Sequence, residues 1–258
     1  MTEQIIAQRL GIALRQVQGT VRLLRDGATI PFISRYRKEA TGSLDELQVG
    51  AVKEQLDKLT ELEARKQTVL STIGEQGKLT DELRKRIEAC WEAVELEDIY
   101  LPYKPKRRTR ATVARERGLE PLANSIMAQN SHDIARQAQR FVTADVPTPE
   151  EAIAGACDII AERVSEDERA RNSVRRTAAR EGAVHSRLVK GKEQEGVKYS
   201  DYFDATSPLR TVSSHRFLAM RRGMDEGVLK ISVEMDADRI TEGLCRQFVR
   251  HGSATREW

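Results

Sequence analysis

The sequence predicts a mainly α-helical fold with one long helix and a small antiparallel β element near residues 184–233. Strong helix formers are abundant, apolar residues recur at steps of three and four, and only seven prolines and 16 glycines interrupt the chain. Hydrophobic residues make up 39% and charged residues 32% of the 258 positions, which favours small cores over one deep core. We therefore expect an elongated helical bundle or scaffold.

Residues 1–42 are expected to form a unit of three short helices. Thr2 can cap the first helix, Gly11 separates it from the second, and Pro31 suits the first turn of the third. The first two resemble a helix-turn-helix, yet the second has few exposed side chains that could read bases. A small helical core explains the pattern better than a sequence-specific duplex reader.

Residues 43–182 are expected to form a helical scaffold. Ser43 and Glu46 match a capping box, and the apolar spacing that follows predicts about thirty residues of helix, on the order of 45 Å long. Lys66 belongs to its charged face, which we expect to face solvent. Further helices are predicted from Thr80 to Val94, from Ser131 to Phe141, and after capping boxes at Thr148 and Ser165.

The pattern changes at Gly182, and residues 183–233 are expected to form a small strand-containing element. Short, partly alternating runs bounded by turns with glycine predict the strands, namely Val184, Arg187–Val189, Val197–Phe203 and Val228–Val233. Residues 234–258 are expected to be helical. Because the chain stops at Trp258 without a clear terminal feature, we expect this segment to begin the truncated continuation of a longer polypeptide.

Positive charge is concentrated in residues 104–117, here called the basic segment. The chain has a formal net charge of +3, whereas this segment alone holds seven cations and one anion. Such a segment beside Tyr100 and Tyr103 suits phosphates, with stacking of bases on the rings. Two alternatives stay open: its cations pair with Glu95, Glu97 and Asp98 or are simply solvated, and the tyrosines belong to the core.

The predicted contacts with RNA or DNA follow from this charge. A second basic cluster lies on the third short helix, and an arginine pair at Arg221 and Arg222 is weak on its own. We predict phosphate contacts from Lys104, Lys106, Arg107, Arg108 and Arg110, with secondary contacts from Arg35, Arg37 and Lys38.

Other classes of function have little support in the sequence. Cys90, Cys157 and Cys245 are far apart and the four histidines form no close-spaced pair, so we expect no metal and no cofactor. The cluster from Ser213 to His215 is more typical of a helix start than of a nucleophile and base, and we expect no catalytic residues. Since no stretch approaches the roughly 18 apolar residues of a membrane span, we expect a cytoplasmic protein without a membrane partner.

Three segments resemble the N-terminal part of the bacterial Tex family of transcription accessory proteins. They are DGATIPFISRYRKEATG at 26–42, LEDIYLPYKPKRRTR at 96–110 and SHRFLAMRRG at 214–223, and the similarity runs through the whole chain in order. The resemblance implies that this chain is the helical N-terminal region of a longer protein. The missing C-terminal domains would include a ribonuclease-H-like domain, helix-hairpin-helix units and an S1 domain as the principal RNA-binding module.

Two functions follow as expectations. The resemblance implies a role in transcription and RNA handling, with binding of nucleic acid that is not base-specific, and no catalytic residue in this region. The first expectation is a non-catalytic scaffold that adds a basic face for RNA or DNA. The alternative is a protein-docking platform on which the long helix meets RNA polymerase, the ribosomal machinery or the missing domains, with nucleic-acid binding confined to those domains.

Overall fold

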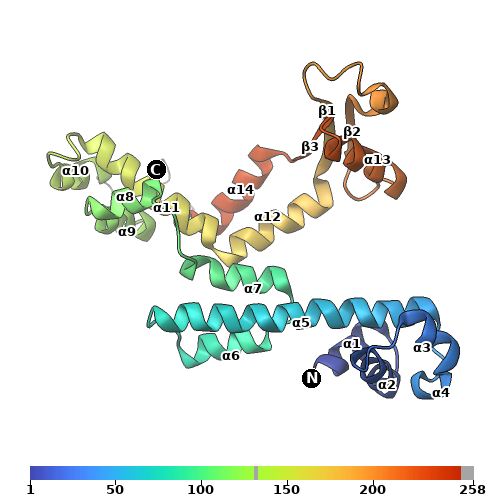
Figure 1. The fold of residues 1–258 in the computed structure, drawn as a ribbon. Coiled ribbons are helices and arrows are strands. Elements are labelled where there is room, and N and C mark those ends of the chain that lie inside the picture. Colours follow the sequence, from blue (N-terminus) through green and yellow to red (C-terminus); the bar gives the residue numbers. More distant parts are fainter. Residues whose placement is uncertain (131–132, 251–258) are drawn as a thin grey trace. The chain divides into compact units, whose positions relative to one another are not determined.

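The computed structural model describes residues 1–130 and 133–250 and divides the chain into two compact units (Figure 1). The N-terminal unit ends at Pro105 and the C-terminal unit begins at Lys106, inside the basic segment. The predicted boundaries at residues 42, 182 and 233 remain predictions, as does the elongated shape. The last part of the predicted continuation, residues 251–258, lies outside the described residues, as do residues 131–132.

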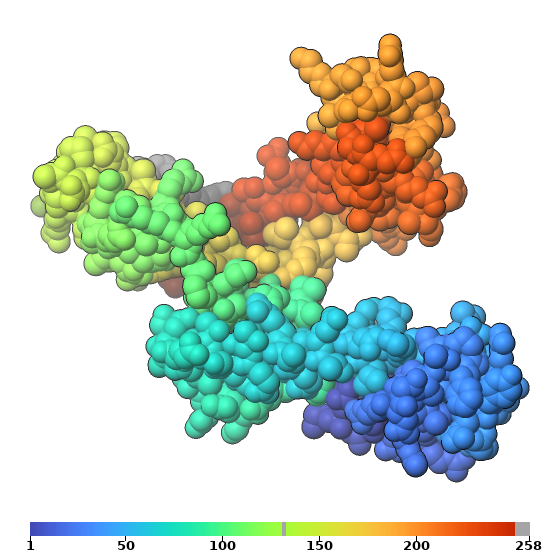
Figure 2. Space-filling model, viewed as in Figure 1, coloured from blue at the N-terminus to red at the C-terminus, as the bar shows by residue number. Residues whose placement is uncertain are grey.

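Four short helices open the N-terminal unit, where Figure 2 shows them in blue as one packed cluster. A Cβ added at Gly19 would lie 2.0 Å from the carbonyl oxygen of Ala40, so glycine is what lets the second helix approach the fourth. The core of the cluster includes the fully buried Ile6, Val17 and Ile33. The helices are α1 (Thr2–Leu10), α2 (Leu14–Arg25), α3 (Ile30–Tyr36) and α4 (Lys38–Thr41).

The predicted long helix is confirmed as α5 (Glu46–Glu75), which has 30 residues. It begins at Asp45, whose carboxylate accepts a hydrogen bond of 2.8 Å from the backbone N–H of Gln48. The Gln48 side chain in turn accepts the backbone N–H of Asp45 at 3.1 Å. The predicted capping box at Ser43 is wrong, because Ser43 has a left-handed φ of 63° where an N-cap residue needs an extended backbone.

Lys66 lies on the buried side of α5, and the prediction that it faces solvent is wrong. Its side chain is 2% exposed. The Nζ atom donates to the carbonyl of Glu88 at 2.9 Å and lies 3.7 Å from the centre of the Trp91 ring. The aliphatic stem can therefore fill the core while the ammonium keeps a carbonyl, an aromatic face and, at 3.5 Å, the Glu63 carboxylate as partners.

The helix predicted from Thr80 to Val94 is two helices, α6 (Asp81–Ala89) and α7 (Ala93–Tyr100). The start is confirmed, since the Thr80 hydroxyl accepts a hydrogen bond from the backbone of α6. The chain is extended at Cys90, with ψ 129°, which ends α6. A short 3-10 turn (Leu101–Tyr103) follows α7 and precedes the basic segment.

The C-terminal unit opens with helices packed around a second core. The predicted capping box at Thr148 is confirmed in its N-cap, but the one at Ser165 is wrong. Ser165 donates to the carbonyl of Glu162 within its own helix, and Asp167 caps the next helix instead. The elements are α8 (Arg110–Glu116), α9 (Glu120–Ala128), α10 (Ile134–Ala138), a 3-10 turn (Gln139–Phe141), α11 (Pro149–Glu166) and α12 (Glu168–Glu181).

The remaining elements form a three-stranded antiparallel sheet with order β2-β1-β3. Its strands are β1 (Ala183–Leu188), β2 (Asp204–Pro208) and β3 (Leu229–Glu234), with α13 (Ser214–Asp225) packed on β3. The strand predicted at Val197–Phe203 is wrong, because Val197–Tyr202 is a 3-10 segment that buries Tyr199 in a small core. The chain continues into α14 (Ala237–Phe248). The predicted mainly α fold with a small antiparallel β element is thus confirmed.

Candidate nucleic-acid interface

The basic segment is held against α11 by the first residues of α8. The Thr109 hydroxyl caps α8 by accepting the backbone N–H of Thr112 at 3.0 Å, and it donates to the Glu162 carboxylate at 3.0 Å. A Cβ at Gly155 would lie 2.4 Å from a methyl carbon of Leu119, so glycine permits this close packing around α11. Cap and packing together fix the side of α11 that the cations meet.

Three carboxylates at four-residue spacing on α11, namely Asp158, Glu162 and Glu166, form what we call the acidic stripe. The spacing places them on one face of the helix. Lys106 lies 3.4 Å from Glu162 and also pairs with Glu166. Arg110 lies 3.4 Å from Asp158. The stripe therefore neutralises part of the positive charge of the basic segment.

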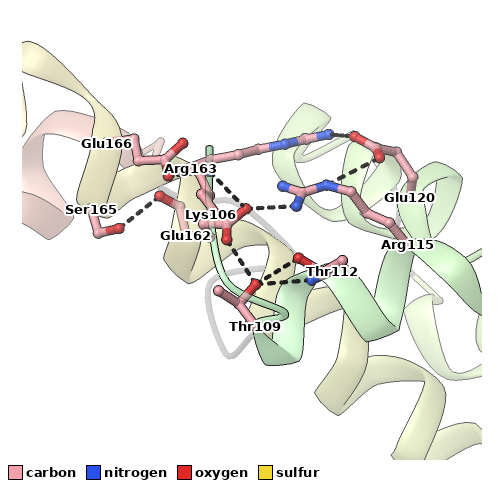
Figure 3. A network of polar contacts seen from close by, with 9 residues as sticks. All are labelled: Lys106, Thr109, Thr112, Arg115, Glu120, Glu162, Arg163, Ser165 and Glu166. Carbon is pink, nitrogen blue, oxygen red and sulfur yellow. Dashed lines mark hydrogen bonds and ion pairs between the residues drawn. The ribbon is translucent and has the colours of Figure 1, made fainter. Parts of the chain in front are cut away.

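Glu162 is the centre of this network (Figure 3). Its side chain is 11% exposed and lies 2.6 Å from the Arg115 guanidinium. Burial alone would raise the pKa of the Glu162 carboxyl, but hydrogen bonds from Arg115 and Thr109, with the charges of Lys106 and Arg115, lower it. Arg115 and Arg163 both pair with Glu120, which links α8, α9 and α11. This arrangement is suited to holding three helices together.

The open alternative for the basic segment is that its cations pair with Glu95, Glu97 and Asp98. Ion pairs do form, but their acidic partners are different residues. Glu97 pairs with Arg65 at 2.6 Å, and Asp98 is 2% exposed. The partners of the basic segment are its own Glu116 and residues of α9 and α11. The acidic stripe is visible in the sequence as a spacing of four, but nothing in the sequence says that the basic segment packs beside it.

A groove of about 480 Å³ beside α8 and α11 gathers three arginines. Arg108, Arg110 and Arg117 line it, together with Gly155 and the acidic residues Glu151 and Asp158. Arg110 is 88% exposed, so its pairing with Asp158 is made in solvent. Within the part of the chain that the structure describes, Arg117 has no ion-pair partner. The groove thus combines a concave surface with guanidinium groups that can exchange partners.

The other predicted contact residues have different surroundings. Lys104, at the end of the N-terminal unit, and Arg107, in the C-terminal unit, are exposed and have no acidic partner among residues 1–130 and 133–250. Lys106 has a side chain 28% exposed and is held by the acidic stripe. Tyr100 is buried and Tyr103 packs against the same core, so the interpretation of both as core residues is favoured over stacking on bases.

The secondary contacts lie on α3, on α4 and at the residue between them, in the N-terminal unit. Arg35, Arg37 and Lys38 are all exposed, and Arg37 lies 3.4 Å from Glu39. The groove arginines belong to the C-terminal unit, so the hypothesis of one shared basic surface stays a prediction. Exposed arginines also occur on α13 of the C-terminal unit, at Arg216, Arg221 and Arg222.

His185, in the middle of β1, joins charges from all three strands of the sheet. Its Nδ1 lies 2.6 Å from the Glu234 carboxylate on β3, and its Nε2 lies 2.6 Å from the Asp204 carboxylate on β2. These hydrogen bonds, first the one that His185 donates to Glu234, raise the pKa of His185 and favour the imidazolium. Both ring nitrogens are engaged, so the cluster is suited to holding strands together rather than to proton transfer.

Two absences concern only the residues that the structure describes. Within residues 1–130 and 133–250, no three His, Cys, Asp or Glu side chains are grouped to hold a metal ion. The three cysteines are free thiols. In the same residues, no helix combines the length and the apolar character of a membrane span.

The fold and this charged groove define a mainly α-helical protein with a small sheet and a concentrated basic surface. Comparison with known proteins gives the family. Residues 1–74 match the Tex-like protein N-terminal domain, and residues 129–257 match the Tex central region. The chain belongs to the Tex family.

Individual relatives agree with this assignment. Transcriptional accessory protein Tex of Neisseria gonorrhoeae is 46% identical over 91% of this chain and 31% of its own length. Protein YhgF of Escherichia coli is 47% identical over 95% of this chain and 32% of its own length. A human protein named S1 RNA-binding domain-containing protein 1 is 26% identical over 96% of this chain and 26% of its own length. The chain spans about a third of the length of its bacterial relatives.

Proposed function

We propose that this chain is a non-catalytic helical part of a Tex transcription accessory protein, and that it binds RNA or DNA without sequence specificity. The observation that carries the proposal is the groove lined by Arg108, Arg110 and Arg117. Guanidinium groups bind phosphate oxygens, and such contacts position a nucleic acid without reading its bases. The names of the Neisseria and human relatives, which refer to transcription and to RNA binding, agree with this role.

The ion pairs of the groove leave it available to a polyanion. Arg108 pairs with Glu116 at 2.7 Å, and both side chains are more than half exposed. Exposed ion pairs of this kind contribute only about 0–1 kcal/mol, so phosphate can replace the carboxylate at small cost. We therefore assign phosphate contact to Lys104, Arg107, Arg108, Arg110 and Arg117.

Lys106 has a different role in this proposal. It pairs with two carboxylates of the acidic stripe and holds the start of the C-terminal unit to α11. A glutamate at this position would place three carboxylates together. A variant that reverses every cation from Lys104 to Arg110 would thus confuse loss of binding with loss of folding.

The test is a quadruple variant, Arg107→Gln, Arg108→Gln, Arg110→Gln and Arg117→Gln, with a control of equal charge change. The control replaces four exposed arginines of the same unit, Arg136, Arg140, Arg169 and Arg176. Fluorescence anisotropy with labelled single-stranded RNA and duplex DNA at about 50 and 200 mM salt covers the range in which phosphate contacts are salt-sensitive. Circular dichroism checks that both variants are folded.

We expect the quadruple variant, called the groove variant from here on, to bind about tenfold or more weakly at the lower salt. The slope of log affinity against log salt concentration should become smaller in magnitude by about two to three for a single strand. The control variant should change affinity much less. An equal loss of affinity in both variants would show that binding depends on the net charge of the chain and not on the groove. Absence of binding by the unaltered chain at the lower salt would reject the proposal and favour the docking platform.

A further inference from the structure

The exposed side of α3, in the N-terminal unit, carries an aromatic pair, whereas the groove residues belong to the C-terminal unit. Phe32 is 44% and Tyr36 is 69% exposed. Their ring centres are 5.6 Å apart, with planes inclined by 42°. The four-residue spacing places both rings on one face of the helix, and Ile33 points into the core instead. Two large rings in mutual contact at the surface form an apolar patch.

The pair is carried by a rigid element. Ile33 is fully buried and Ser34 is 7% exposed, where its hydroxyl donates to the carbonyl of Pro31 at 3.2 Å. Helix α3 packs on the long helix α5 through this inner side. The backbone that carries the rings is thus held in place, which lowers the entropy lost when a flat ligand stacks on them.

The charge around the pair is positive. Arg35 lies between the two rings in sequence, and Lys38 follows at the start of α4; both are exposed and have no acidic partner in the part of the chain that the structure describes. Arg37 is partly neutralised by Glu39, 3.4 Å away. Exposed rings interleaved with unpaired cations match the chemistry of single-stranded nucleic acid, whose bases are free to stack and whose phosphates are negative.

We infer that Phe32 and Tyr36 form a stacking platform for unpaired bases, with Arg35 and Lys38 on the flanking phosphates. The inference rests on the proposed function and deepens it, because it assigns a preference for single strands over duplexes. Bases in a duplex are already stacked on each other, so they cannot cover the rings without being unstacked. Base stacking does not distinguish RNA from DNA, and both single strands are expected to bind.

The test replaces the rings while keeping their apolar bulk, with the double variant Phe32→Leu and Tyr36→Leu of the whole chain. The control is Tyr36→Phe, which keeps the aromatic face. Both are titrated with single-stranded RNA and DNA of about 12 nucleotides and with a duplex of about 12 base pairs, lengths within the range of single-strand sites. A 2-aminopurine in the single strand reports stacking directly, because its fluorescence is quenched when it stacks on a ring.

We expect the double variant to bind single strands about 5- to 100-fold more weakly, with an unchanged salt dependence, because stacking releases no counterions. Duplex affinity should stay within twofold, and the quenching of 2-aminopurine should disappear. The Tyr36→Phe control should behave like the unaltered chain. Single-strand affinity that does not change, or losses equal for single strand and duplex, would overturn the platform.

The groove variant separates this inference from the function on which it rests. If the groove variant loses affinity while the leucine variant keeps it, the platform fails and the proposed function stands. If the unaltered chain binds no nucleic acid, both fail. If only the leucine variant loses single-strand affinity, the platform stands and the groove assignment falls.

Discussion

The basic segment and the cluster on α3–α4 place their cations in different surroundings. In the basic segment, Lys106, Arg108, Arg110 and Arg115 all have carboxylate partners. On α3–α4, Arg37 alone has one among residues 1–130 and 133–250, at 3.4 Å. The denser cluster in the sequence is therefore the more neutralised one in the structure. Local charge density does not measure the charge that a ligand meets, because helices distant in sequence can supply the counter-charges.

The largest expected effect comes from breaking the acidic stripe at its centre. Glu162→Gln should lower the free energy of unfolding by about 1–3 kcal/mol, because Lys106 and Arg115 lose their shared carboxylate while each keeps a second one, Glu166 and Glu120. The matched control is Glu116→Gln, which breaks the exposed pair with Arg108 and should cost no more than about 1 kcal/mol. Urea unfolding followed by circular dichroism measures both.

The same carboxylate gives an acid dependence. Since the pKa of Glu162 is lowered in the folded chain, its contribution is present above the unfolded pKa, near the usual 4.5, and is lost as the pH falls through the folded value. The Glu162→Gln variant should lack this part of the acid sensitivity. Equal free energies of unfolding for Glu162→Gln and its control Glu116→Gln at neutral pH would contradict the central position of Glu162.

Two neighbouring cations sharpen the comparison. Lys106→Gln should lower the free energy of unfolding by about 1–2 kcal/mol and leave nucleic-acid affinity within twofold, because Lys106 is held by α11. Arg107→Gln should weaken nucleic-acid binding and leave the free energy of unfolding nearly unchanged, since Arg107 is exposed and has no acidic partner in the described residues. Urea unfolding measures the stability of both variants, and anisotropy titration measures their affinity. A loss of affinity in Lys106→Gln alone would contradict the assignment of Lys106 to structure and Arg107 to phosphate contact.

A smaller effect is expected on α3–α4. The double variant Arg35→Gln and Lys38→Gln should reduce the slope of log affinity against log salt concentration by about one in single-strand binding. This is the change expected for two lost phosphate contacts. Arg37→Gln is the control and should change it less, because Glu39 already shares its charge. Titrations at several salt concentrations measure the slopes. A larger change from Arg37 than from the pair would show that the pairing with Glu39 does not persist in solution.

The smallest effect concerns the sheet. The raised pKa of His185 means that its contribution to stability is complete below the unfolded pKa, near 6.5, and is lost as the pH rises through the folded value. His185→Asn should remove this pH dependence. Urea unfolding at pH 6 and at pH 9 tests this prediction. If the free energy of unfolding falls by the same amount between these pH values in His185→Asn and in the unaltered chain, the role of the cluster with Glu234 and Asp204 is contradicted.

Much of the helical fold could be predicted because its determinants are local. Thr80 and Thr148 cap helices as expected, and the apolar spacing gave α5 its length. The errors arise where a local pattern competes with packing. Lys66 has the sequence context of a surface residue but packs on Trp91, and Val197–Tyr202 alternates like a strand but turns to bury Tyr199.

The candidate site could be predicted only in part. The cations of the basic segment are evident from composition, whereas their division into groove-lining and structural residues is not. Arg117 lines the groove although it was not among the predicted contacts, and Lys106 is held by α11 although it was. The spacing of Phe32 and Tyr36 is visible in the sequence, but their exposure depends on which face of α3 meets the core.

The sequence by itself determined the mainly α class, the long helix, the small β element and the concentration of charge. Capping, helix propensity and apolar periodicity depend on residues within a few positions of each other, so they can be read along the chain. Only the tertiary structure decided which cations are neutralised and which rings are exposed. Glu162 lies more than 40 residues from the cations it binds, and electrostatic pairing depends on distance in space rather than on distance in sequence.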